Sequence, residues 1–164
     1  VQPWNRVAST SVDPDDDMTM WTLQPFVDAV DSWGLRLVRI VAPPPAAIAS
    51  VSPTSLAAGL TGATVTVTGT SAGGSGFFDP GAGFARRLAA SFGAGVTVTG
   101  VTFTSPTSIT LTVNTVGAAA GPRTLVVTNP DGQIATRASA LTITTAPVNQ
   151  PPVAVNDAVA IAFG

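Results

Sequence analysis

The chain has 164 residues and a formal net charge of −2 at pH 7, and 45% of its residues are hydrophobic. It contains no histidine, cysteine, tyrosine, lysine or glutamate, so its 7 basic residues are all arginine and its 9 acidic residues are all aspartate. General acid–base and nucleophilic catalysis depend mostly on the missing residue types, as do zinc, haem and iron–sulfur sites. We therefore expect no enzyme activity and no cofactor, with calcium as the metal that the remaining oxygen ligands would suit.

The arginines are scattered along a slightly acidic chain, so the basic patch that nucleic acid binding requires is missing. No apolar run reaches the roughly 18–20 residues of a membrane span. The first residues, Val1-Gln2-Pro3-Trp4, resemble neither an initiator methionine nor a signal peptide. We expect a mature or excised piece of a longer protein, with no nucleic acid partner and no membrane span.

Residues 1–45 contain all three tryptophans, both methionines and most of the aspartates. Alternation of apolar and polar residues predicts strands over Met18–Leu23 and Trp33–Ile40. Pro25–Ser32 is predicted as a turn of helix or an irregular connection. Two strands alone are marginal in water, so we expect them to pair with or cover another part of the protein. Three side chains of the second strand are expected on one face: Leu35, Leu37 and Arg39.

An acidic stretch precedes the first of these strands. Asp13, Asp15 and Asp17 have the spacing of the first ligands in a calcium loop, but the glycine and glutamate that complete such a loop are missing. A solvated acidic turn is the favoured interpretation, and calcium binding by these three aspartates is the alternative. The run from Ser11 to Trp21 also resembles the closing strands of large secreted bacterial β-propeller-like domains. That resemblance implies a missing upstream domain.

Residues 42–47, Ala-Pro-Pro-Pro-Ala-Ala, are predicted to form a stiff linker between domains. Beyond them, valine, isoleucine and leucine alternate with threonine at period two, which is typical of strands with one buried face. A further strand ends in Asn129-Pro130-Asp131-Gly132, a sequence that favours chain reversal and therefore a hairpin. These patterns predict a two-sheet β-sandwich. The expected strands are 48–55, 64–68, 96–99, 101–104, 109–113, 125–128 and 141–144.

Residues 46–146 contain several short motifs: Val51-Ser52-Pro53, Val65 to Thr70, Phe92-Gly93, Ser105 to Ile109, Ala120-Gly121-Pro122 and Val127 to Gly132. Together these motifs are similar to those of IPT/TIG domains, the immunoglobulin-like modules of extracellular and some DNA-binding proteins. The resemblance implies an all-β, Ig-like Greek-key sandwich in an extracellular or cell-surface location. The weakly acidic charge argues against the DNA-binding branch of the family.

A glycine-rich insertion, Ser71 to Arg87, departs from the shortest family pattern and contains three phenylalanines. Exposing a phenylalanine ring instead of burying it costs roughly 1.5–3 kcal/mol, so these rings must pack somewhere. The favoured interpretation is that they cover one end of the sandwich. The alternative is a contact patch for a protein or a surface glycan. That patch would consist of Phe77, Phe78, Phe84, Arg86 and Arg87.

Residues 147–164 are predicted to form a linker and one isolated strand with an apolar face. Residues 151–157 resemble the opening of cadherin-like repeats of bacterial surface proteins, which implies that another module begins there. A free apolar strand needs a partner sheet edge, in the same molecule or in a neighbour. The residues expected to mediate such assembly are Val153, Val155, Val159, Ile161 and Phe163.

Taken together, the residues and the resemblances predict a non-catalytic structural or assembly module of a large extracellular bacterial surface protein. Donation of the strand in residues 153–163 would produce a filament or stalk, with copies of the chain or neighbouring modules as partners. Two alternatives stay open. One is a carbohydrate- or protein-binding adhesin module, and the other is an accessory domain of a secreted enzyme.

Overall fold

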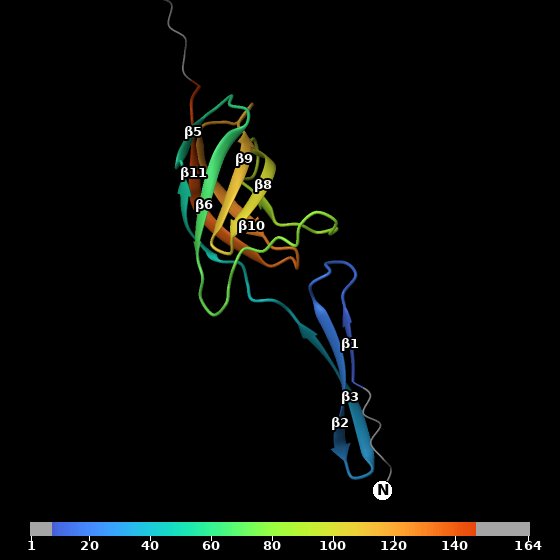
Figure 1. Cartoon of the computed structure of the whole chain (residues 1–164). Helices are drawn as coiled ribbons and strands as arrows, with labels where there is room; N and C mark the ends of the chain where they lie inside the picture. The colour runs from blue at the N-terminus through green and yellow to red at the C-terminus, as the bar shows by residue number, and fades with distance from the viewer. Residues whose placement is uncertain (1–7, 147–164) are drawn as a thin grey trace, which may run out of the picture.

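The computed structural model describes residues 8–146, which form eleven β-strands in three sheets and no helix (Figure 1). The prediction of an all-β protein is confirmed. Within this range no helix is long and apolar enough to cross a bilayer. The predicted assembly strand, with Val153, Val155, Val159, Ile161 and Phe163, lies outside the described residues.

The first sheet is antiparallel and has the order β1-β2-β3. Its strands are β1 (Ser9–Val12), β2 (Met20–Ala29) and β3 (Ser32–Ile40). The two predicted strands are confirmed, but the prediction of a helical or irregular segment after Pro25 is wrong. Alternation continues through Val27, so the ladder runs on to a tight turn in which Asp31 has a positive φ of 60°.

The other two sheets have four strands each. One has the order β4-β6-β9-β8 and contains β4 (Ala47–Ser52), β6 (Ala63–Thr70), β8 (Thr97–Ser105) and β9 (Ser108–Asn114). The other has the order β5-β11-β10-β7 and contains β5 (Ser55–Ala57), β7 (Ala89–Ser91), β10 (Gly121–Thr128) and β11 (Ile134–Thr144). Together these sheets form a curled half-barrel (Figure 1).

Two expected strand boundaries differ from the structure. The strand expected over residues 48–55 is two strands, β4 and β5, which belong to different sheets. Pro53, which has no N–H to donate to a ladder, lies where the chain changes sheet. The strands expected over 96–99 and 101–104 are a single strand, β8, with a register shift between Val98 and Gly100.

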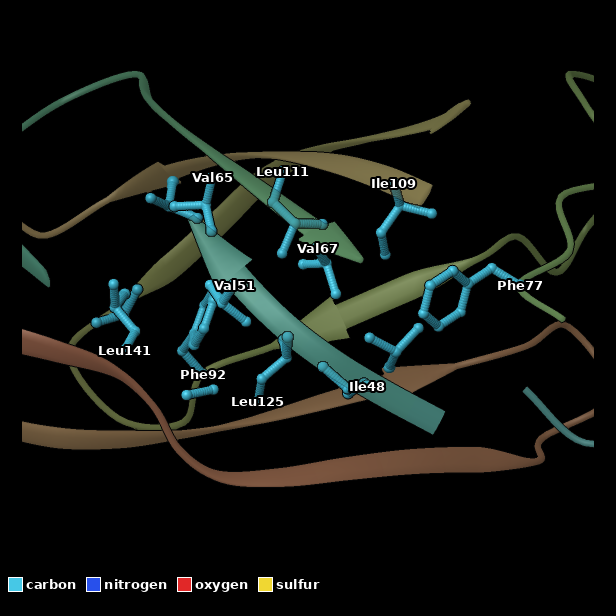
Figure 2. Close-up of a cluster of buried hydrophobic side chains, with 14 of the residues drawn as sticks. Ile48, Val51, Val65, Val67, Phe77, Phe92, Ile109, Leu111, Leu125 and Leu141 are labelled. Atoms are coloured by element: carbon cyan, nitrogen blue, oxygen red, sulfur yellow. The ribbon is translucent and has the colours of Figure 1, made fainter. Parts of the chain in front are cut away.

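One hydrophobic core lies between the two four-stranded sheets (Figure 2). Val65, Val67 and Leu111 reach it from one sheet, and Leu125 and Leu141 from the other, all with no exposed surface. Threonines occupy the alternate positions of the same strands, as the period-two pattern predicts. Burial of each large apolar side chain contributes roughly 1.5–3 kcal/mol, so this core is the main source of stability.

The three-stranded sheet differs in this respect. Between residues 8 and 41 no hydrophobic side chain is buried, and the buried side chains are the polar ones of Asp16, Thr19 and Thr22. This sheet therefore lacks a core of its own.

Candidate functional site

Three segments meet at one end of the hydrophobic core. They are the insertion loop from Ser71 to Leu88, the β10–β11 turn from Asn129 to Gln133, and the connecting segment from Ala42 to Ala46. We call this region the junction, because the connecting segment leads from it to the three-stranded sheet. Four of the five residues expected to form a contact patch lie in the insertion loop beyond Phe77.

Asn129 holds the insertion loop against the β10–β11 turn. Its side chain is almost completely buried, and its Nδ2 donates a hydrogen bond to the carbonyl oxygen of Gly76 at 2.9 Å. The backbone N–H of Phe78 donates to Oδ1 of Asn129 at 3.1 Å. An asparagine amide is suited to this position because it carries a donor and an acceptor at once. The Asn-Pro-Asp-Gly sequence forms the predicted reversal, but its role in fixing a distant loop was not predicted.

The connecting segment is docked on the same turn. Nε2 of Gln133 donates to the carbonyl oxygen of Ala42 at 2.7 Å and to Oδ2 of Asp131 at 2.6 Å. The backbone N–H of Gly76 donates to the carbonyl oxygen of Pro44 at 3.0 Å. The next residues, Pro45 and Ala46, are buried. The sequence predicts a stiff linker between domains here, and the structure shows that the segment also packs against the larger sheets.

The phenylalanines of the insertion loop have different roles. Phe77 is only 1% exposed and belongs to the hydrophobic core, so its assignment to a surface contact patch is wrong (Figure 2). Its backbone N–H donates to the carbonyl oxygen of Pro106 at 2.7 Å, which turns the ring inward. Phe78 and Phe84 are each 43% exposed. The favoured interpretation, in which the loop covers one end of the core, therefore holds for Phe77 alone.

Both arginines of the expected patch are engaged in ion pairs. The guanidinium of Arg86 pairs with the carboxylate of Asp15 and also donates from Nε to the Asp15 carbonyl oxygen at 3.1 Å. Arg87 forms a two-point pair with Asp79, with Nη2 donating to Oδ2 at 2.6 Å. The hydrogen bond from Arg87 lowers the pKa of Asp79 and outweighs the opposite effect of burial. The Arg86–Asp15 pair links the insertion loop to the acidic turn of the three-stranded sheet.

The acidic turn between β1 and β2 is closed by its own side chains. Oδ1 of Asp13 accepts the backbone N–H of Asp15 and Oδ2 accepts Nε1–H of Trp21, both at 3.0 Å. These two hydrogen bonds lower the pKa of Asp13, and the one from Trp21 has the larger effect. Between residues 8 and 146, no three acidic side chains come close enough together to hold a metal ion. The geometry thus gives no support to calcium binding by Asp13, Asp15 and Asp17.

Asp16 is the buried aspartate of this turn. It is not one of the three aspartates that have the spacing of calcium ligands. Burial raises its pKa, but hydrogen bonds from the hydroxyl and backbone of Thr19 and from the backbone of Met18 outweigh that effect and lower it. Asp16 is therefore a structural residue that stabilises the turn as a carboxylate.

Two shallow hollows of about 350 and 340 Å³ lie on the larger sheets. Small residues of two loops line the first, where Arg123 is the charged side chain. The second contains the Asp79–Arg87 pair and Thr99, whose hydroxyl donates to the carbonyl oxygen of Thr112 at 3.2 Å. Arg123 donates from Nη1 to the carbonyl oxygen of Pro122 at 3.1 Å and from Nη2 to that of Ala119 at 2.5 Å, while its buried Nε has no partner among the described residues.

The last strand of the larger unit, β11, lies beside β5, the short strand that follows β4. β5 pairs in parallel with β11, with Leu56 opposite Ile143. The ladder is extended at both ends, because the N–H of Thr142 donates to the carbonyl oxygen of Thr54 at 2.8 Å and that of Ala58 to Thr144 at 2.9 Å. These hydrogen bonds join the first part of the unit directly to its last strand.

No protein-family model matches the chain, and no curated protein shows significant similarity to it. The similarity of residues 46–146 to IPT/TIG domains therefore stays a prediction, as do the resemblances of residues 11–21 and 151–157 to β-propeller-like and cadherin-like modules.

Proposed function

We propose that the chain is a non-catalytic structural module of a large extracellular bacterial surface protein, in which residues 46–146 are an Ig-like Greek-key sandwich that acts as a spacer. The order of the strands supports this proposal. Constant-type Ig domains have strands A, B, E and D in one sheet and C, F and G in the other. The sheets β4-β6-β9-β8 and β5-β11-β10-β7 have the same order, with β5 as a continuation of strand A beside strand G.

The parallel pairing of β5 with β11 is the observation that carries the proposal. β4 precedes β5 along the chain, and tension that reaches β5 through it pulls β5 toward its N-terminus and β11 toward its C-terminus. Because the strands run parallel, that tension shears all the hydrogen bonds of the pair at once. A spacer in a surface protein bears load in this direction.

The junction supports the same role. Hydrogen bonds from Gln133 to Ala42 and from Gly76 to Pro44 fix the direction in which the connecting segment leaves the larger unit. A spacer that controls the orientation of its neighbour needs such contacts, since a flexible linker would not fix that orientation.

Single-molecule force spectroscopy tests the proposal, and the absence of cysteine makes the attachment points unique. One protein carries Thr54→Cys, directly before β5, and Ala146→Cys, so that the pull shears β5 from β11. A matched protein carries Pro122→Cys and Thr142→Cys, at two exposed residues that pair at the open end of the β10·β11 hairpin. A pull between these two positions unzips the hairpin one hydrogen bond at a time. We expect a clearly higher unfolding force for the first pair at the same loading rate. Equal or lower force would refute the load-bearing role.

The filament or stalk formed through residues 153–163 is a separate part of the proposal. Deleting residues 151–164 tests it by size-exclusion chromatography and electron microscopy. Loss of the larger assemblies supports strand donation, and unchanged assembly removes it.

An adhesin module is the second candidate, favoured by the exposed rings of Phe78 and Phe84 on an insertion loop that Asn129 holds in place. Aromatic side chains on a fixed loop suit contact with a sugar face or a protein. A glycan array probed with the native chain, Phe78→Ala and Val116→Ala tests it, because Val116 is an exposed apolar residue outside this loop. Binding lost only in Phe78→Ala supports this candidate, and no binding on the array counts against it.

A further inference from the structure

In the three-stranded sheet, β2 and β3 form one face that is made almost entirely of apolar side chains, and Ser9 and Ser11 of β1 lie at its edge. Cross-strand pairing places Leu23 opposite Leu37, Pro25 opposite Leu35, and Val27 opposite Trp33. Directly paired residues project to the same side of a sheet. We call this side the Trp33 face; it consists of Trp21, Leu23, Pro25, Val27, Trp33, Leu35 and Leu37.

The Trp33 face is large and open. Trp33 is 67% exposed, Leu37 62%, Val27 57% and Leu35 51%. Side chains exposed to this degree contribute on the order of 400–500 Å² together, near the upper end of the apolar patches of about 300–600 Å² that monomers show. A stable interface buries about 800 Å² per partner, so this face supplies more than half of one. A three-stranded sheet without buried apolar side chains gains its missing core by covering this face.

The row of side chains along β3 on this face is self-complementary. It begins with Trp33, continues with Leu35 and Leu37, and ends with Arg39, which lies over the ring of Trp21 at 6.0 Å from its centroid. An identical row turned by 180° about Leu35 places its Trp33 against Leu37 of the first, twice.

The position of the larger sheets selects the same orientation. The chain leaves β3 at Ile40 toward these sheets, which lie beyond that end of the three-stranded sheet (Figure 1). Two copies packed with their β3 strands running in the same direction would bring both larger units to one place. The antiparallel arrangement puts them at opposite ends and leaves the apolar faces free to meet at the usual separation of about 10 Å.

We propose that the Trp33 face binds a second copy of this chain in a two-fold symmetric, antiparallel dimer whose axis passes near Leu35. The inference deepens the assembly role proposed above and names the partner and the contact surface. It is independent of the load-bearing β5·β11 pair, because the dimer contact uses only β2 and β3.

Symmetry gives a sharp test. Because Leu35 meets its own copy near the axis, Leu35→Arg and Leu35→Asp each place two like charges together and are expected to be monomeric. An equal mixture of the two variants is expected to form a heterodimer, since opposite charges then face each other. Leu35 is exposed, so neither change disturbs the hydrophobic core. Val116→Arg is the matched control on another exposed apolar residue, in the β9–β10 turn, and it is expected to leave the dimer unchanged.

Sedimentation equilibrium at micromolar concentrations measures the result in chains that lack residues 151–164, so that strand donation adds nothing to the mass. Circular dichroism checks that each variant keeps the strand signal of the parent chain. We expect twice the mass of one chain for the parent chain, Val116→Arg and the mixture, and the mass of one chain for each Leu35 variant alone. A monomeric parent chain overturns the inference. That result is expected if an upstream domain or another partner covers this face instead. So does a Leu35→Arg dimer or a mixture that stays monomeric. None of these outcomes changes the expected difference in unfolding force, so the dimer and the load-bearing role fail separately.

Discussion

Asn129 donates a hydrogen bond from Nδ2 to the carbonyl oxygen of Gly76 at 2.9 Å, across 53 residues of sequence. The same amide accepts the backbone N–H of Phe78, so one buried side chain satisfies two polar groups of the insertion loop. The β10–β11 turn thereby holds the segment that carries Phe77 into the core. The hydrophobic end of the core and the polar junction are built by the same loop.

Asn129→Ala is expected to lower the free energy of unfolding by about 1–3 kcal/mol, because it leaves the Gly76 carbonyl and the Phe78 amide without their partner. Asn129→Asp, of nearly equal size, is expected to destabilise as well, since it replaces the donor to Gly76 with an acceptor. Urea unfolding measures both. Thr124→Ala, at an exposed position of β10, serves as control with a change within about 0.5 kcal/mol. An Asn129→Ala change no larger than that of the control would contradict the assigned role.

Phe77→Ala is expected to destabilise the protein by about 3–5 kcal/mol, since it empties a ring-sized volume in the core. Phe78→Ala removes a ring from the adjacent position, where 43% of the residue is already exposed, and is expected to cost much less. Denaturant midpoints of the two variants measure the difference. Equal costs would mean that the inward path of the loop at Phe77 is incorrect.

Acid is expected to weaken the turn between β1 and β2 of the three-stranded sheet. Hydrogen bonds from Trp21 and Asp15 lower the pKa of Asp13 below the ordinary value of 3.8, and those from Thr19 and Met18 lower that of Asp16. A carboxylate whose folded pKa is lowered stabilises the fold fully above the unfolded value. That stabilisation is lost as the pH falls below about 4 toward the folded pKa.

The indole N–H resonance of Trp21, which reports its hydrogen bond to Asp13, follows this transition in an NMR titration. We expect its chemical shift to stay constant from pH 7 to about 5 and to change below about 4. Asp16→Asn is expected to weaken the turn already at pH 7 and to reduce its pH dependence. A change in the resonance centred well above pH 4 would contradict the lowered pKa values.

How much of this fold the sequence predicts depends on the range of the interactions. Val65, Val67 and the intervening threonines indicate a strand because their period-two alternation is local. In the same way, the local alternation through Val27 indicates that β2 extends beyond the predicted end at Leu23. β5 and β7, with three residues each, are too short to show a period. They exist because neighbouring strands provide hydrogen-bonding partners.

The junction was beyond prediction for a different reason. Adjacent residues of an extended loop point to opposite sides, so Phe77 and Phe78 could be expected to differ. Which of them turns inward depends on Asn129, which lies 51 residues from Phe78 in sequence. The pair between Arg86 and Asp15 spans 71 residues. Contacts of this kind leave no periodic signal, although a buried asparagine in a turn is a position at which to look for one.

The junction fixes the direction of the three-stranded sheet relative to the larger unit. Residual dipolar couplings of backbone N–H bonds measure this relationship directly, with residues 20–40 and 47–144 fitted separately. We expect one alignment tensor to describe both sets in the native chain. We expect two different tensors when Gln133→Ala and Arg86→Ala together remove the side-chain contacts to Ala42 and Asp15. Independent tensors in the native chain would contradict the claim.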